Sequence, residues 1–167
     1  MKHYLKISAF ILAFSNITAQ ESQTTLAILD FEGRGINTLE AATLTDRFTS
    51  GVGKTKAMRL VDRTMVEEIL TEQGFQQSGC TSDECAVEVG AMLGVQFMIS
   101  GAIGKLGETF TIDAKMVSVE TGASVETRNV TYIGKVDGLV TEIELLAWDI
   151  MNLDPPAALK EKKRLGA

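Results

Sequence analysis

The sequence predicts one α/β domain in which a mixed sheet of about five strands packs with about four helices. The first half alternates short apolar runs with segments of helical periodicity, which is typical of parallel strands joined by helices. The second half contains three segments of period two joined by short turns, which indicates an antiparallel meander. No internal repeat and no second domain is evident in the chain.

The amino-terminal residues have the features of a signal peptide. Lys2 and Lys6 surround the start of the chain with positive charge, residues 7–14 are an apolar run, and Ala19 offers the small side chain preferred at a cleavage site. The run is far shorter than the roughly 20 residues that span a bilayer as a helix. Residues 1–19 are therefore expected to direct the protein to the periplasm, and no later segment predicts a transmembrane helix.

The remainder divides into a domain, residues 20–153, and a flexible basic tail, residues 154–167. The domain begins with an apolar run at 25–31 that predicts a buried strand. Asn37, with Glu40 three residues later, has the spacing of a capping box and predicts a helix start. A short strand at 57–62 and a second helix ending at Gly74, a residue suited to a helix terminus, complete the first half. Four apolar residues mark the inner face of the first helix: Ala41, Leu44, Phe48 and Val52.

Both cysteines lie in the stretch "GCTSDEC", residues 79–85. Thr81 as N-cap with Glu84 at the third helical position would form a capping box and bring Cys80 close to Cys85. Export to an oxidising compartment favours a disulfide between them. A metal site that adds Asp83, Glu84 or Glu88, and a redox-sensing pair, are the alternatives. A zinc site would need ligands beyond two thiolates.

The second half predicts strands at 95–106, 110–116 and 124–133, followed by a helix over 137–150 that ends before Pro155. Along 110–116, apolar side chains alternate with Thr111, Asp113 and Lys115, so one face of this strand is polar. The alternation breaks near Ser118, which predicts a bulge or a change of register.

Composition excludes several classes of function. The chain has a net charge of −6 and no concentrated basic face, so nucleic-acid binding is not expected. Its only histidine, His3, lies in the signal peptide, which excludes histidine-dependent catalysis and histidine zinc sites in the mature protein. "GVGKT", residues 51–55, lacks the spacing of a phosphate loop and follows a helix instead of preceding one. We therefore predict no catalytic residues, no cofactor and no metal.

Three charged residues are candidates for ligand or partner contacts. Asp30 ends the first strand, Arg34 follows it, and Lys105 lies near the end of the third predicted strand. They are expected near a pocket at the strand ends. A structural role for Asp30 in holding the loop "EGRG" is the simpler interpretation.

Four segments resemble the CsgG family of curli assembly and transport proteins: "LAILDFEGRGINTLEAATLTDRF", "MRLVDRTMVEEILTEQGF", "CTSDECAVEVGAMLGVQFMISGAIGKLG" and "TFTIDAKMVSVETG". The order of elements is also similar to the amino-terminal domain of TolB-type periplasmic proteins and to outer-membrane activators of cell-wall synthases. The resemblance covers residues 26–150. It implies an α/β periplasmic domain that acts by assembly, without catalytic residues.

Two departures limit what this resemblance implies. Curli secretion channels are lipoproteins with long inserted hairpins, whereas this chain lacks the lipid-accepting cysteine and joins its strands by short turns. We therefore expect a non-enzymatic envelope protein that binds a protein partner or self-associates, without forming a pore. The alternatives are a component of a curli-like secretion channel and a small-ligand-binding or enzymatic envelope protein. Peripheral contact of the basic tail with the outer membrane or peptidoglycan is a further possibility.

Overall fold

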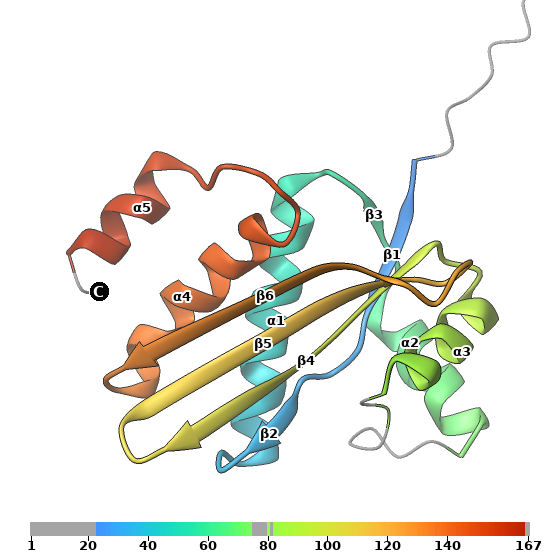
Figure 1. Ribbon diagram of the computed structural model, residues 1–167, viewed down its shortest axis with the longest axis horizontal. Coiled ribbons are helices and arrows are strands. Elements are labelled where there is room, and N and C mark those ends of the chain that lie inside the picture. The colour runs from blue at the N-terminus through green and yellow to red at the C-terminus, as the bar shows by residue number, and fades with distance from the viewer. Residues whose placement is uncertain (1–22, 75–79, 81, 166–167) are drawn as a thin grey trace, which may run out of the picture.

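The computed structural model describes residues 23–74, 80 and 82–165, and these form one α/β domain (Figure 1). Five strands pair in the order β3 (Arg59–Leu60), β1 (Thr25–Ile28), β4 (Phe97–Leu106), β5 (Thr109–Ser118) and β6 (Ser124–Ile133). A sixth short strand, β2 (Glu32–Arg34), pairs with β4 beyond the end of β1. β1 is parallel to β3 and β4, whereas β4, β5 and β6 form an antiparallel meander. The predicted fold class is confirmed.

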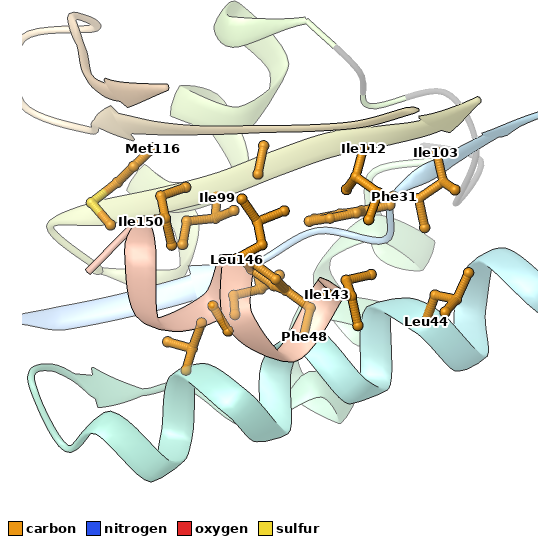
Figure 2. Close-up of a cluster of buried hydrophobic side chains, with 14 of the residues drawn as sticks. Phe31, Leu44, Phe48, Ile99, Ile103, Ile112, Met116, Ile143, Leu146 and Ile150 are labelled. Atoms are coloured by element: carbon orange, nitrogen blue, oxygen red, sulfur yellow. The ribbon is translucent and has the colours of Figure 1, made fainter. Parts of the chain in front are cut away.

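Two helices cover one face of the sheet. α1 (Thr38–Thr55) and α4 (Val136–Asp149) lie side by side beneath the strands and enclose the larger core (Figure 2). The helices approach closely because residue 51 is glycine: a β-carbon there would lie 2.7 Å from the Cβ of Ala147. Phe48, Phe110 and Ile143 are at most 1% exposed in this core, where burial of each large side chain contributes about 1.5–3 kcal/mol.

The opposite face of the sheet is covered only in part. α2 (Arg63–Glu72) and α3 (Asp83–Leu93) pack over β1 and the adjoining ends of β4 and β5 (Figure 1). They enclose a second, smaller core that contains Leu29, Val66, Val89, Met98 and Val117. Beyond these helices the side chains of β5 and β6 on this face are exposed. The sheet therefore has one fully covered face and one partly open face.

The helix starts follow from local side-chain hydrogen bonds. The capping box predicted for α1 is present, since Asn37 accepts from the Glu40 backbone and Glu40 accepts from the Asn37 backbone. Asp62 caps α2. The prediction of Thr81 as the cap of α3 is wrong, because Ser82 caps this helix by accepting from the Cys85 backbone; Thr81 itself lies outside the described residues.

The structure joins Cys80 to Cys85 in a disulfide, with the two Cα atoms 5.4 Å apart. Cys80 is 4% exposed and belongs to the smaller core. The bond therefore ties the start of α3 to the hydrophobic layer beneath it. The shift of the cap from Thr81 to Ser82 places Cys85 in the first turn of α3, within reach of Cys80.

Two elements differ from the expected pattern. β2 was not predicted because its sequence, "EGR", has no strand-like periodicity; its pairing with β4 brings it into the sheet. The tail predicted to be flexible contains α5 (Ala157–Arg164), which begins after Pro156 and is linked to α4 by the ion pair Lys163–Glu142 at 2.9 Å.

The predicted irregularity near Ser118 is a register shift between Met116 and Val117. The predicted signal peptide lies outside the described residues.

Loss of the Cys80–Cys85 bond should lower the free energy of unfolding by about 2 kcal/mol, because it closes a short loop in the unfolded chain. Urea unfolding of a Cys80→Ser, Cys85→Ser variant against the oxidised protein measures this difference. Mass spectrometry of protein purified from the periplasm should find the two cysteines joined. Two free thiols in that sample would contradict the assignment.

Candidate functional site

The exposed part of the sheet's second face is the candidate site, and we call it the open face. It is formed by the outward side chains of β5 and β6, because strand alternation turns Phe110, Ile112 and Ala114 to the covered core. The outward residues are mainly polar: Thr111, Asp113, Lys115, Thr127, Asn129 and Thr131. Two exposed aliphatic side chains lie at one end of this face, Leu106 at 86% and Ile133 at 73% exposure. The face thus combines polar groups with apolar anchors.

A depression of about 270 Å³ lies on the open face where it meets α3 and β2. Its floor includes Ser100 and Ala102 of β4, which are largely buried. Five charged side chains surround it: Glu32, Arg34, Asp83, Asp113 and Lys115. They come from β2, α3 and β5, so the depression depends on elements far apart in the sequence.

Ion pairs organise these charges. Arg34 Nη2 lies 2.6 Å from Glu32 Oε2, and Lys115 Nζ lies 3.0 Å from Asp83 Oδ2. The hydrogen bond and the charge of Glu32, with a smaller contribution from Asp113, raise the pKa of Arg34. Both ion pairs are accessible to solvent. Because exposed ion pairs contribute little free energy, a charged group of a binding partner can replace one member of each pair at low cost. The arrangement suits recognition of a polar protein surface.

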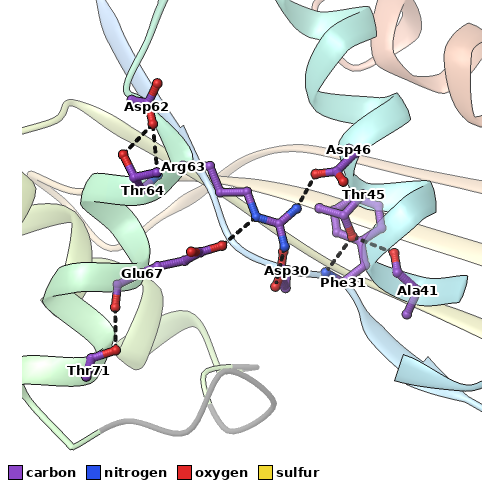
Figure 3. Close-up of polar contacts among 10 residues, drawn as sticks. All are labelled: Asp30, Phe31, Ala41, Thr45, Asp46, Asp62, Arg63, Thr64, Glu67 and Thr71. Atoms are coloured by element: carbon purple, nitrogen blue, oxygen red, sulfur yellow. Dashed lines mark hydrogen bonds and ion pairs between the residues drawn. The ribbon is translucent and has the colours of Figure 1, made fainter. Parts of the chain in front are cut away.

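Asp30 belongs to a second cluster, at the end of β1 (Figure 3). Arg63 of α2 reaches it with Nη2 at 2.8 Å from Asp30 Oδ1. The same guanidinium binds Glu67 through Nε at 2.8 Å and pairs with Asp46 of α1 through Nη1. Arg63 therefore connects α2, β1 and α1.

Burial raises the pKa of Asp30, while the charge of Arg63 acts in the opposite direction. The neighbouring backbone is also held, because the Phe31 N–H donates to Thr45 Oγ1 at 3.0 Å. A cavity of about 270 Å³ adjoins this cluster and shares Glu32 with the open-face depression. These contacts favour the structural interpretation of Asp30.

The three residues predicted to share a pocket do not lie together. Arg34 lines the open-face depression, and Asp30 is held by Arg63. Lys105 lies on the other side of the sheet, with Nζ 5.1 Å from the centre of the Phe110 ring. Their roles as ligand or partner contacts stay predictions.

Of the five charged residues around the depression, only Arg34 was predicted as a contact; the other four were not: Glu32, Asp83, Asp113 and Lys115. The alternation along 110–116 already placed Asp113 and Lys115 on an outward face. Asp83 could not be identified, because its approach to Lys115 depends on how α3 packs against the sheet.

Within the described part of the chain, no group of three or more histidine, cysteine, aspartate or glutamate side chains could hold a metal ion. No helix in the same residues has both the length and the apolar character needed to cross a bilayer.

Comparisons with known proteins identify the family. The family described as peptidoglycan-synthase activator LpoB matches residues 8–126. The fold is similar to the LpoB C-terminal domain from Salmonella enterica, with a TM-score of 0.56 and 13% identity over 67% of this chain and 84% of that domain. It is also similar to the lipoprotein GNA1162 from Neisseria meningitidis, with a TM-score of 0.59 and 10% identity over 85% and 92% of the two chains.

A third similar structure is the PelC dodecamer from Paraburkholderia phytofirmans, with a TM-score of 0.54 and 11% identity over 80% of this chain and 91% of that chain. At these identities the three structures show a shared fold. Comparison with curated protein sequences found no match.

The resemblance to the CsgG family is therefore wrong, because the family match is to LpoB. The segments quoted for that resemblance follow the order of strands and helices, which proteins of this fold share at low identity. Curli assembly, secretion and a place in a curli-like secretion channel rested on that resemblance and are withdrawn with it. The similarity in element order to activators of cell-wall synthases agrees with the family match.

Replacing Arg63 with methionine should destabilise the fold by about 1–3 kcal/mol at neutral pH, because Asp30 would be left partly buried and charged without its partner. The pKa of Asp30 should rise further in the variant, which an NMR titration of its carboxyl group would detect.

The pH dependence of this loss has a definite sign. A carboxyl group with a raised pKa in the folded state binds protons more tightly there, so its contribution to stability decreases as pH rises through that pKa. The loss in Arg63→Met should therefore be small below 3.8, the ordinary pKa of Asp30, and full at neutral pH. Adding Asp30→Asn should reduce this pH dependence, leaving the part due to Glu67 and Asp46; an unchanged dependence would contradict the assignment.

Proposed function

Because the chain belongs to the family of the peptidoglycan-synthase activator LpoB, we propose that it binds a peptidoglycan synthase in the periplasm and raises the activity of that enzyme. The family match is the observation that carries this proposal. It agrees with the expectation from the sequence of a non-enzymatic envelope protein that acts through a protein partner, and with a predicted signal peptide that delivers the chain to the periplasm.

We infer that the open face contacts the synthase. It offers exposed aliphatic anchors, Leu106 and Ile133, beside a depression lined by charges of both signs. Protein interfaces commonly combine apolar anchors with polar surroundings that determine specificity. The opposite face of the sheet is covered by α1 and α4 and offers no comparable surface of the strands.

The enzymatic alternative rested mainly on Asp30. That carboxylate is bound by Arg63 at 2.8 Å, and the same arginine also holds Glu67 and Asp46. An ion-paired carboxylate of this kind suits the structural role better than proton transfer. The proposed activity therefore lies in the synthase, and this chain acts as its regulator.

Addition of the purified protein should increase the rate of glycan polymerisation by a peptidoglycan synthase from the same bacterium.

Asp113→Arg reverses one exposed charge on the open face and should weaken binding at least about tenfold, which corresponds to about 1.4 kcal/mol. Glu68→Arg makes the same change on the exposed side of α2 and should leave binding unchanged.

Binding is measured by surface plasmon resonance and activation by the polymerisation rate. Absence of any rate increase with the unaltered protein would contradict the proposed function. Activation with equal effects of the two variants would instead reject the open face as the contact surface.

A further inference from the structure

The depression on the open face has a floor of small side chains from β4. Ser100 and Ala102 form this floor, because strand alternation turns Ile103 between them and Gly104 into the larger core. The next outward residue, Gly104, has no side chain to raise the floor, and a β-carbon there would lie 2.6 Å from Thr111 Oγ1. The floor is therefore low, whereas the flanking strands carry longer side chains.

The walls of the depression come from β2 and β5, which pair with β4 on either side (Figure 1). The register places Ala102 between Glu32 and Asp113 in one row across the three strands. Because neighbouring strands lie about 4.8 Å apart, the Cα atoms of these two acidic residues are about 10 Å apart across the floor. The space between them admits one inserted side chain.

Two of the three carboxylates around the depression already have a cation. Glu32 accepts hydrogen bonds from Arg34, at 3.0 Å from Nε and 2.6 Å from Nη2. Asp83 accepts from Lys115 Nζ at 3.1 Å and 3.0 Å. Within the described residues, the side chain of Asp113 has no hydrogen bond and no ion pair. The depression therefore carries one negative charge in excess, and this charge is located at Asp113.

Ser100 supplies a second acceptor that the fold leaves unused. The residue is 6% exposed and lines the depression, and its hydroxyl makes no hydrogen bond with any other described residue. In the same part of the chain no side-chain oxygen is sealed from solvent without a partner, so this hydroxyl opens onto the depression. A hydroxyl in so buried a residue is usually hydrogen-bonded, because desolvation without a partner costs free energy. An incoming donor would satisfy it.

Ser100 and Asp113 are close enough to serve one ligand. Asp113 lies opposite Ala102, so Ser100 is its diagonal neighbour on the adjacent strand. Diagonal neighbours in an antiparallel pair are about 7–8 Å apart at the backbone. Both side chains project to the same face, and a group placed over Ala102 can therefore contact both.

We propose that the depression receives an arginine side chain of the peptidoglycan synthase, with its guanidinium group hydrogen-bonded to Asp113 and Ser100 above Ala102. The identity of the partner rests on the proposed function, whereas the kind of side chain rests on the depression itself. A guanidinium fits better than an ammonium because its N–H groups point in fixed directions within one plane and can serve two separate acceptors. Its flat shape also suits a floor without bulky side chains.

An anionic group of the partner would meet unfavourable charges here. Lys115 is paired with Asp83, and Arg34 is paired in the same way. An incoming anion would have to displace one of these partner carboxylates and would also face Asp113. An incoming cation displaces no existing ion pair. Because the walls exclude part of the surrounding water, its hydrogen bond to a carboxylate is stronger than on a flat surface.

The kind of side chain is tested without the synthase. N-acetyl-arginine amide is titrated into isotope-labelled protein, and the backbone amide signals around the depression are followed by NMR. Signals of Ser100, Ala102 and Asp113 should shift at millimolar probe. N-acetyl-citrulline amide has nearly the same shape without the charge and should bind at least about tenfold more weakly. Equal responses to the two probes, or no response at the depression, would overturn the proposal.

The complex is tested by surface plasmon resonance with variants that change charge but little volume. Asp113→Asn should raise the dissociation constant for the synthase at least about tenfold. Lys115→Gln should lower the constant, because it removes a positive charge that repels the incoming cation. Glu68→Gln removes one charge from the exposed side of α2 and should leave binding unchanged.

The outcomes separate this proposal from the proposed function. Weaker binding of Lys115→Gln with unchanged binding of Asp113→Asn would overturn the proposal in favour of an anionic group, while binding of the synthase itself would stand. Failure of the unaltered protein to bind the synthase would reject the proposed function, and with it the synthase as the source of the arginine. The response to the arginine probe would then be decisive for the kind of side chain that the depression takes.

Discussion

The close contact between α1 and α4 is the constraint on which the other features of the domain depend. Gly51 allows the two helices to meet at Ala147, and together they cover one complete face of the sheet. With the larger core placed there, the opposite face needs only α2 and α3 over its first strands. The remaining strands can then expose polar side chains without loss of the core. The open face exists because burial is concentrated on one side.

Arg63 and the cysteine bond connect the second layer to this frame. Arg63 links α2 with β1 and α1, and Cys80 ties the start of α3 to the smaller core. The ion pair between Asp83 and Lys115 then joins α3 to the open face. The side of the depression formed by α3 is therefore held by the disulfide and by this ion pair, which favours a preformed surface over one that orders on binding.

Elements with local signals could be predicted from the sequence, and those that depend on distant contacts could not. Asn37 and Glu40 lie within one turn, so their capping box was visible in the chain. β2 has no pattern of its own and is a strand only because β4 pairs with it. The polar face of β5 was predicted from the alternation of its residues. How much of that face α3 covers could not be predicted, because it depends on how the helix packs on the sheet. The ion pair between Arg63 and Asp30 likewise could not be predicted, because the two residues lie 33 positions apart in the sequence.

The parallel placement of β1 between β3 and β4 has a consequence for the time course of folding. Thr25 at the start of β1 bonds with Gln96, 71 residues later, whereas β4, β5 and β6 are neighbours along the chain. Contacts between distant residues form slowly because a long loop must close first. The hairpins of the meander can form early, while β1 emerges first and pairs late. The slow step in acquiring the native state is then the docking of the amino-terminal strand into the gap beside β4.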